Sequence, residues 1–146
     1  MPADSDVKKQ IDDLLKADDF MAVIYGLAAG LILVIRLKDV AMVNRLIPGN
    51  HPEIYKNLDV SIVDHIILEK LLGMAGGADK SGLAYSHDLL DSVSRVKSGE
   101  FQLTILIRAV KPETLKAVSD AGDKMPPKST YFYPKAPAGL ILNRLV

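Results

Sequence analysis

The pattern of hydrophobic and polar positions predicts strands towards both ends of the chain. Apolar runs at 20–25 and 31–37 flank a short glycine-containing turn, which is typical of a β-hairpin. Further apolar runs predict strands at 83–86, 101–107 and 139–143. Residues 32–35 are apolar on both faces, so the second hairpin strand is expected inside a sheet.

Apolar residues at helical spacing predict helices between and beside these strands. The strongest pattern begins at Leu58, with Asp59 as the expected N-cap and Gly73 as the stop. Pro112 is expected in the first turn of the last helix, which Gly122 ends. Residues 53–57 are predicted as a weakly ordered connection. The predicted helices cover residues 4–18, 38–47, 58–72, 87–97 and 112–121.

The order of these elements predicts an α+β (mixed α/β) fold. Strand, helix and strand follow one another between residues 83 and 108, which predicts a crossover unit with two parallel strands. We therefore expect a single mixed β-sheet of about five to six strands with helices packed on it. A chain of 146 residues fits one domain covering 1–146.

Composition and charge exclude several classes of protein. Eighteen basic residues balance eighteen acidic ones, so we expect no nucleic-acid partner, and self-association meets little charge repulsion. The chain has no cysteine, which excludes disulfides and thiolate metal sites. The acidic N-terminus does not resemble a signal peptide, and the longest apolar run, 20–35, is short for a membrane span. We expect no membrane association and a cytoplasmic protein.

The stretch 125–135 is the most unusual in composition and is the candidate site. It combines three prolines and three consecutive aromatic residues with lysines and hydroxyls. Pro126 and Pro127 restrain the backbone that leads into Lys128, and the basic, hydroxyl-rich residues that follow suit a phosphate or carboxylate group. In an extended segment Tyr131 and Tyr133 share one face. The predicted substrate-binding residues are Lys128, Ser129, Thr130, Tyr131, Tyr133 and Lys135.

Two alternatives stay open for these residues. The stretch 125–135 also fits a proline-stiffened segment whose aromatic side chains fill the edge of the core. It lacks the glycine loop of a nucleotide-binding P-loop.

His65 and Glu69 stand four residues apart on the strongest predicted helix. They could form a metal pair or a general-base pair, but the favoured interpretation is a structural hydrogen bond. Asp88 fits a helix cap. The secondary candidates are His65, Glu69, Tyr85 and Asp88, and no metal site is predicted.

Four motifs in one order resemble a known family. They are Leu58-Asp59-Val60 leading into residues 65–69, then 85–88, then 121–124, then 125–135 followed by Gly139-Leu140. Together they closely resemble the C-terminal part of the uncharacterised bacterial and archaeal family called domain of unknown function 1015. The resemblance covers most of the chain from about Leu58 onward. One departure is Ala138-Gly139, where the family commonly has threonine and glycine.

The resemblance implies that this chain corresponds to the C-terminal portion of longer proteins. Their N-terminal part distantly resembles the nuclease and serine-kinase group related to the chromosome-partitioning protein ParB. We therefore expect a site for a phosphate-bearing or other anionic small molecule, within a phosphoryl-transfer-type enzyme. The alternative is a non-catalytic structural or interaction domain that docks on an N-terminal partner or self-associates. The sequence assigns no cofactor and no catalytic residue. We also expect the stretches 65–69, 85–88 and 125–135 to converge in space.

Overall fold

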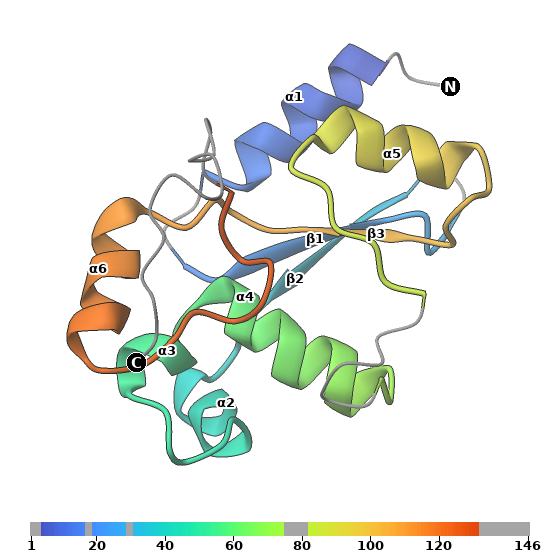
Figure 1. The fold of residues 1–146 in the computed structure, drawn as a ribbon. Coiled ribbons are helices and arrows are strands. Elements are labelled where there is room, and N and C mark those ends of the chain that lie inside the picture. The colour runs from blue at the N-terminus through green and yellow to red at the C-terminus, as the bar shows by residue number, and fades with distance from the viewer. Residues whose placement is uncertain (1–3, 17–18, 29–30, 75–81, 132–146) are drawn as a thin grey trace, which may run out of the picture.

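The computed structural model describes residues 4–16, 19–28, 31–74 and 82–131, and within them it has an α+β architecture (Figure 1). Among these residues, no helix is both long and apolar enough to cross a membrane. The strands are β1 (Met21–Tyr25), β2 (Ile32–Arg36) and β3 (Thr104–Leu106). The helices are α1 (Asp4–Leu14), α2 (Val40–Leu46), α3 (Glu53–Lys56), α4 (Asp59–Ile62), η1 (Val63–Leu71), α5 (Leu89–Lys97) and α6 (Pro112–Asp120).

The predicted hairpin is confirmed, but its second strand, which was expected inside a sheet, lies at an edge of the described sheet and is only partly buried. Strands β1 and β2 pair antiparallel, with Met21 opposite Arg36 and Tyr25 opposite Ile32. Strand β3 pairs with the other edge of β1, also antiparallel, so the strand order is β2-β1-β3. The most buried strand is therefore β1, which has neighbours on both sides.

Two predictions about the sheet are wrong for the described residues. They form a sheet of three antiparallel strands, not a mixed sheet of five to six. Residues 83–86 form no strand, because three of these four residues are exposed and only Leu83 packs towards the core. The predicted parallel crossover loses its first strand as a result. The predicted strand 139–143 lies outside the described residues.

The alternation of side chains along β1 places a separate apolar core on each face of the sheet. Ala22 belongs to the larger core, which the helices from α2 to η1 and α6 complete. Val23, the next residue, belongs to the smaller core with Val93 of α5 and residues of α1. Figure 1 shows the same layering, with α1 and α5 on one side of the strands and α4 on the other.

The strongest predicted helix is confirmed, with a different start and an unusual geometry. It begins as α4 after Leu58, and Asp59 lies inside the first turn, not at the N-cap. The helix continues as the π-helix η1, which contains both His65 and Glu69. Gly73 follows with a positive φ of 67°, as a C-terminal stop requires. π-Helical geometry is rare and is frequently found at functional sites, so the polar residues of this helix are candidates for a site.

The remaining helices show which local sequence signals were sufficient to predict a helix and its ends. Helix α6 has Pro112 in its first turn, and Gly122 follows it with a φ of 75°, as predicted. Residues 53–57 were predicted as weakly ordered, which is wrong: α3 occupies most of them, because Tyr55 is buried in the core. The shorter helix α2 buries Val43 and leaves Val40 and Leu46 exposed.

Candidate functional site

The described part of the candidate stretch forms a tight turn followed by a short extended piece. The Ser129 amide donates to the Pro126 carbonyl at 3.3 Å, which closes a four-residue turn. Lys128, at the third position, has a φ of 61°, the left-handed conformation that this position of a type II turn requires. The Ser129 hydroxyl also donates to the Pro126 carbonyl, at 2.6 Å. Tyr133 and Lys135 lie outside the described residues.

Three of the predicted binding residues line a hollow of about 190 Å³, which we call the α6 hollow. The hydroxyl-bearing wall comes from Ser129, Thr130 and Tyr131. The rest of the lining comes from α6 and from Ala109 and Val110, which precede it. The lining residues are Ala109, Val110, Pro112, Leu115, Ser129, Thr130 and Tyr131. Lys128 is exposed and does not belong to this lining, because the turn places it on the outside.

A second predicted stretch, 85–88, meets the α6 hollow through one ring contact. The ring of His87 stacks on the ring of Tyr131, with centroids 4.2 Å apart and planes 5° apart. Tyr85 is 52% exposed and Tyr131 is 54% exposed, so the aromatic side chains here lie at the surface. The stretch 85–88 therefore lies beside the candidate stretch 125–135, as expected, and the contact is at Tyr131.

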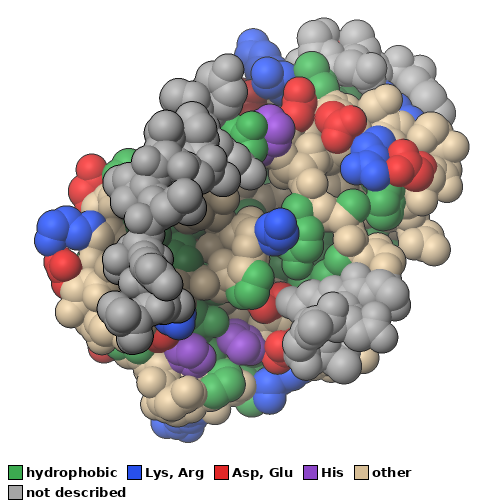
Figure 2. Space-filling view, viewed as in Figure 1, with side chains coloured by type: hydrophobic (Ala, Val, Ile, Leu, Met, Phe, Trp, Pro, Cys, Tyr) green, Lys and Arg blue, Asp and Glu red, His purple; other side chains and the backbone are tan. Residues whose placement is uncertain are grey.

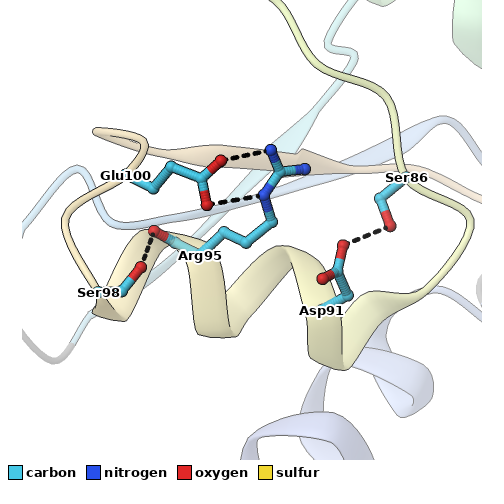
Figure 3. A network of polar contacts seen from close by, with 5 residues as sticks. All are labelled: Ser86, Asp91, Arg95, Ser98 and Glu100. Atoms are coloured by element: carbon cyan, nitrogen blue, oxygen red, sulfur yellow. Dashed lines mark hydrogen bonds and ion pairs between the residues drawn. The ribbon is translucent and has the colours of Figure 1, made fainter.

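The turn that carries His87 is fixed by a network of short polar contacts. Asp88 is the N-cap of α5 and accepts from the amides of Leu90 and Asp91, at 2.8 and 3.2 Å. The Ser86 hydroxyl donates to the Asp91 carboxylate at 3.1 Å (Figure 3). Asp88 thus acts as a helix cap, the structural alternative for this residue, and it holds His87 in place.

His65 and Glu69 form the hydrogen bond that their spacing predicted, as part of a larger cluster. His65 Nδ1 donates to the Glu69 carboxylate at 3.0 Å, which leaves Nε2 to accept from the Tyr55 hydroxyl at 3.4 Å. The ring of Tyr55 stacks on that of His51, with centroids 3.9 Å apart. His51 Nδ1 then donates to the Asp123 carboxylate at 2.7 Å. We call these five residues the histidine cluster.

Burial and pairing set the charge states within the histidine cluster. Burial raises the pKa of Tyr55, so its hydroxyl stays protonated at neutral pH and acts as a donor. The hydrogen bond from His51 lowers the pKa of Asp123 below its ordinary 3.8, and the Lys124 amide acts in the same direction. Asp123 is therefore a carboxylate at every pH where histidine titrates.

Sequence reasoning missed His51, Tyr55 and Asp123. His51 stands in a proline- and glycine-rich loop and marked only the end of a helix. Its contact with Asp123 spans 72 residues, and no periodic pattern encodes such a contact. The spacing of His51 and Tyr55, four residues, was the one local signal for their stacking.

Of the three stretches expected to converge, 85–88 and 125–135 meet, through His87 and Tyr131. The link towards 65–69 is indirect, because it runs from Asp123, which precedes 125–135, to His51, which lies outside 65–69. The segment 123–131 contacts the histidine cluster at its first residue, Asp123, and the 85–88 turn at its last, Tyr131. His65 and Glu69 do not line the α6 hollow. Figure 2 shows histidine side chains near the top and near the bottom of one face, with a hollowed surface between them.

A bidentate ion pair links the central helix to the wall of the α6 hollow. Arg108 donates to both carboxylate oxygens of Asp59, through Nε at 2.6 Å and a terminal nitrogen at 2.7 Å. Arg108 directly precedes Ala109, a lining residue. The pair therefore fixes the backbone that enters the hollow relative to the start of α4.

The described residues hold no group of three or more histidine and carboxylate side chains placed to bind a metal ion. In comparisons with known proteins, no family model, no curated protein and no solved structure matches the chain. The family resemblance therefore stays an expectation that rests on the motifs of the sequence.

Proposed function

We propose that the α6 hollow binds a small anionic group, such as sulfate or the phosphate group of a larger molecule. The observation that supports this most is that three consecutive hydroxyl-bearing residues, Ser129, Thr130 and Tyr131, line the hollow. The Ser129 hydroxyl already donates to the Pro126 carbonyl, so Thr130 and Tyr131 supply the hydroxyl donors. Hydroxyls and backbone amides are common donors to phosphate groups. The hollow, at about 190 Å³, is below the usual size of drug-sized pockets, which favours a small group.

The start of α6 gives the hollow a favourable electrostatic environment. The N-cap residue Lys111 makes no side-chain cap hydrogen bond, and a helix of nine residues has its positive dipole end at this position. Lys111 and Lys128 flank the lining in the sequence, while Glu113 in the first turn opposes them. The balance of these three charges favours an anion modestly, and we expect weak binding.

Binding, not catalysis, is the role proposed for the hollow itself. The lining residues of the described chain include no histidine, carboxylate or lysine, and Tyr131 is the titratable side chain among them. In a phosphoryl-transfer enzyme this chain would hold the phosphate group, and a partner chain or domain would supply the remaining groups.

Calorimetry with sulfate tests this proposal. We expect saturable binding with a dissociation constant of about 1 mM, since a few neutral hydrogen bonds supply most of the free energy. Thr130→Val and Tyr131→Phe each remove one hydroxyl and keep the shape, and each is expected to weaken binding about 3- to 10-fold. Ser119→Ala, at the other end of α6, is the control and should leave the affinity unchanged. Sulfate binding that is undetectable, or equally tight in both hydroxyl variants, would contradict the proposal.

A second proposal, an interaction domain, is supported by the exposed apolar side chains of α2. Val40, Met42 and Leu46 are 50%, 60% and 37% exposed, and the zero net charge offers little repulsion between copies. This proposal predicts a dimer in sedimentation velocity that Met42→Lys dissociates. A wild-type monomer at every concentration, with no change on substitution, rules out self-association through α2.

A further inference from the structure

Histidines from two distant parts of the chain hold the two ends of the segment 123–131. Asp123 at the first end accepts a hydrogen bond from His51, 72 residues earlier. Tyr131 at the other end stacks on His87. Ser129, Thr130 and Tyr131 of the α6 hollow belong to this segment, so its position decides whether their hydroxyls converge on a ligand.

The first attachment rests on a chain of contacts that reaches the π-helix. Glu69 fixes the ring of His65, His65 accepts from Tyr55, and the ring of Tyr55 supports that of His51 at an interplanar angle of 11°. The side chains of His51 and Asp123 are 22% and 19% exposed, which is enough shielding for their interaction to matter. The hydrogen bond between His51 and Asp123 is thus supported by neighbouring contacts and is not a chance contact at the surface.

The second attachment rests on the cap of α5. His87 lies between Ser86 and Asp88. The Ser86 hydroxyl accepts from the Asp88 amide and donates to the Asp91 carboxylate, and the Asp88 carboxylate accepts from the Leu90 and Asp91 amides. The ring planes of His87 and Tyr131 differ by 5°, so the imidazole lies flat over the aromatic face. A cation in this position is attracted by the quadrupole of the tyrosine ring.

Between the two attachments the segment has little freedom. Met125 packs against the larger core and Pro126 is buried. The turn that follows contains Pro127 and the left-handed Lys128. Motion at either end is therefore transmitted to the hydroxyls, because the residues between are restrained.

We propose that His51 and His87 are positioning residues for the anion site, and that their protonation tightens the segment 123–131 in its binding position. The inference rests on the proposed function of the α6 hollow. Protonation of His51 turns its hydrogen bond to Asp123 into an ion pair, and protonation of His87 adds a cation–π attraction to Tyr131. Affinity for an anion is therefore expected to rise as the pH falls through the range in which histidine titrates.

Carboxylates stand near both imidazoles and favour their protonated forms. His51 bonds Asp123 from the loop after α6, and the stacked Tyr55 feels the charges of Asp64 and Glu69 from η1, while the neighbouring His65 opposes them when it is protonated. Because the pKa of Asp123 is lowered, this residue stays ionised throughout the pH range in which histidine titrates. The ion pair between His51 and Asp123 is therefore lost as the pH rises, and not as it falls. Around His87, Asp88 and Asp91 lie on the α5 side and the Tyr131 ring on the other.

Sulfate titrations from about pH 5.5 to about pH 8.5 test the proposal, since sulfate keeps its charge there whereas phosphate does not. We expect wild-type affinity to weaken about 3- to 10-fold across this range. His51→Asn keeps a neutral donor near Asp123, and His87→Phe keeps a stacked ring, so each should lose about half of the dependence on a logarithmic scale. The double variant retains His65 and the change of the protein's net charge with pH. Any pH dependence of sulfate affinity that remains in it therefore measures these two effects.

A ligand-free measurement separates this inference from the proposed function. Nitrogen-15 relaxation of the amides in 125–131 reports the order of the segment without sulfate. Order that is higher at low pH in the wild type, and independent of pH in the double variant, supports positioning even if sulfate fails to bind. Order and affinity that do not depend on pH, or that change equally in the double variant, would overturn it.

Discussion

Gly26→Ala is expected to destabilise the protein by about 3 to 5 kcal/mol, or to prevent folding. Gly26 follows β1 with a φ of 104°, a conformation that L side chains rarely adopt. A Cβ atom here would lie 2.5 Å from the Gln102 carbonyl oxygen and 2.6 Å from a methyl carbon of Val96. The contact with backbone cannot relax without moving the loop that leads into β3. Chemical denaturation, monitored by circular dichroism, measures the change.

Two other glycines separate the causes of this effect. Gly122 has a φ of 75°, and a Cβ atom added there would have no neighbour within 4 Å. Gly122→Ala therefore tests backbone strain alone and should cost about 1 to 2 kcal/mol. Gly49 has neither a positive φ nor a close neighbour, and Gly49→Ala should be nearly neutral. If Gly26→Ala costs no more than Gly122→Ala, close approach of β3 to the hairpin does not limit stability.

Asp59→Asn is expected to destabilise the protein by about 2 to 4 kcal/mol. The Asp59 side chain is 10% exposed and the Arg108 side chain 27% exposed, so the substitution removes a largely shielded charge pair that is joined by two short hydrogen bonds. The carboxylate also lies in the first turn of α4, where the helix dipole favours a negative charge. Denaturation at neutral pH, compared with the wild type, gives the change in free energy of unfolding.

Arg95 and Glu100 provide a matched control with the same bidentate geometry at the surface (Figure 3). Their side chains are 31% and 52% exposed, so solvent screens the pair and Glu100→Gln should cost clearly less than Asp59→Asn. Equal costs for the two substitutions would show that burial of the Asp59–Arg108 pair adds nothing. A larger loss of sulfate affinity in Asp59→Asn than in Glu100→Gln would further link this pair to the wall of the hollow.

The parts of the fold that local chemistry specifies were predictable. Two apolar runs and a glycine-containing turn specified the β1–β2 hairpin, and Pro112 and Gly122 marked both ends of α6. Failures occurred where tertiary contacts overrode local preference. Asp59 has the chemistry of an N-cap, yet it pairs with Arg108, 49 residues away. The run 83–86 has the composition of a strand and finds no partner strand in the described sheet.

The candidate site was predictable in its chemistry and only partly in its arrangement. Spacing was enough for the His65–Glu69 hydrogen bond and for the Asp88 cap, since both are contacts within one turn of helix. Residues 129–131 line a hollow, but Lys128 does not, because it adopts a left-handed φ in the turn that precedes them. The sequence did not reveal this conformation. The pairing of His51 with Asp123 depends on how α3 and α6 pack, which only the folded chain shows.

Chemical-shift mapping with sulfate tests the central claim most directly, because it reports where an anion binds as well as whether it binds. We expect saturable shifts of backbone amides in 109–115 and 129–131, and Thr130→Val should reduce them at the same sulfate concentration. The amides at the start of α1, on the opposite side of Figure 1 from α6, should not shift. Shifts that are absent from the α6 hollow, or that are spread over the exposed lysines without saturating, would contradict an anion site at this position.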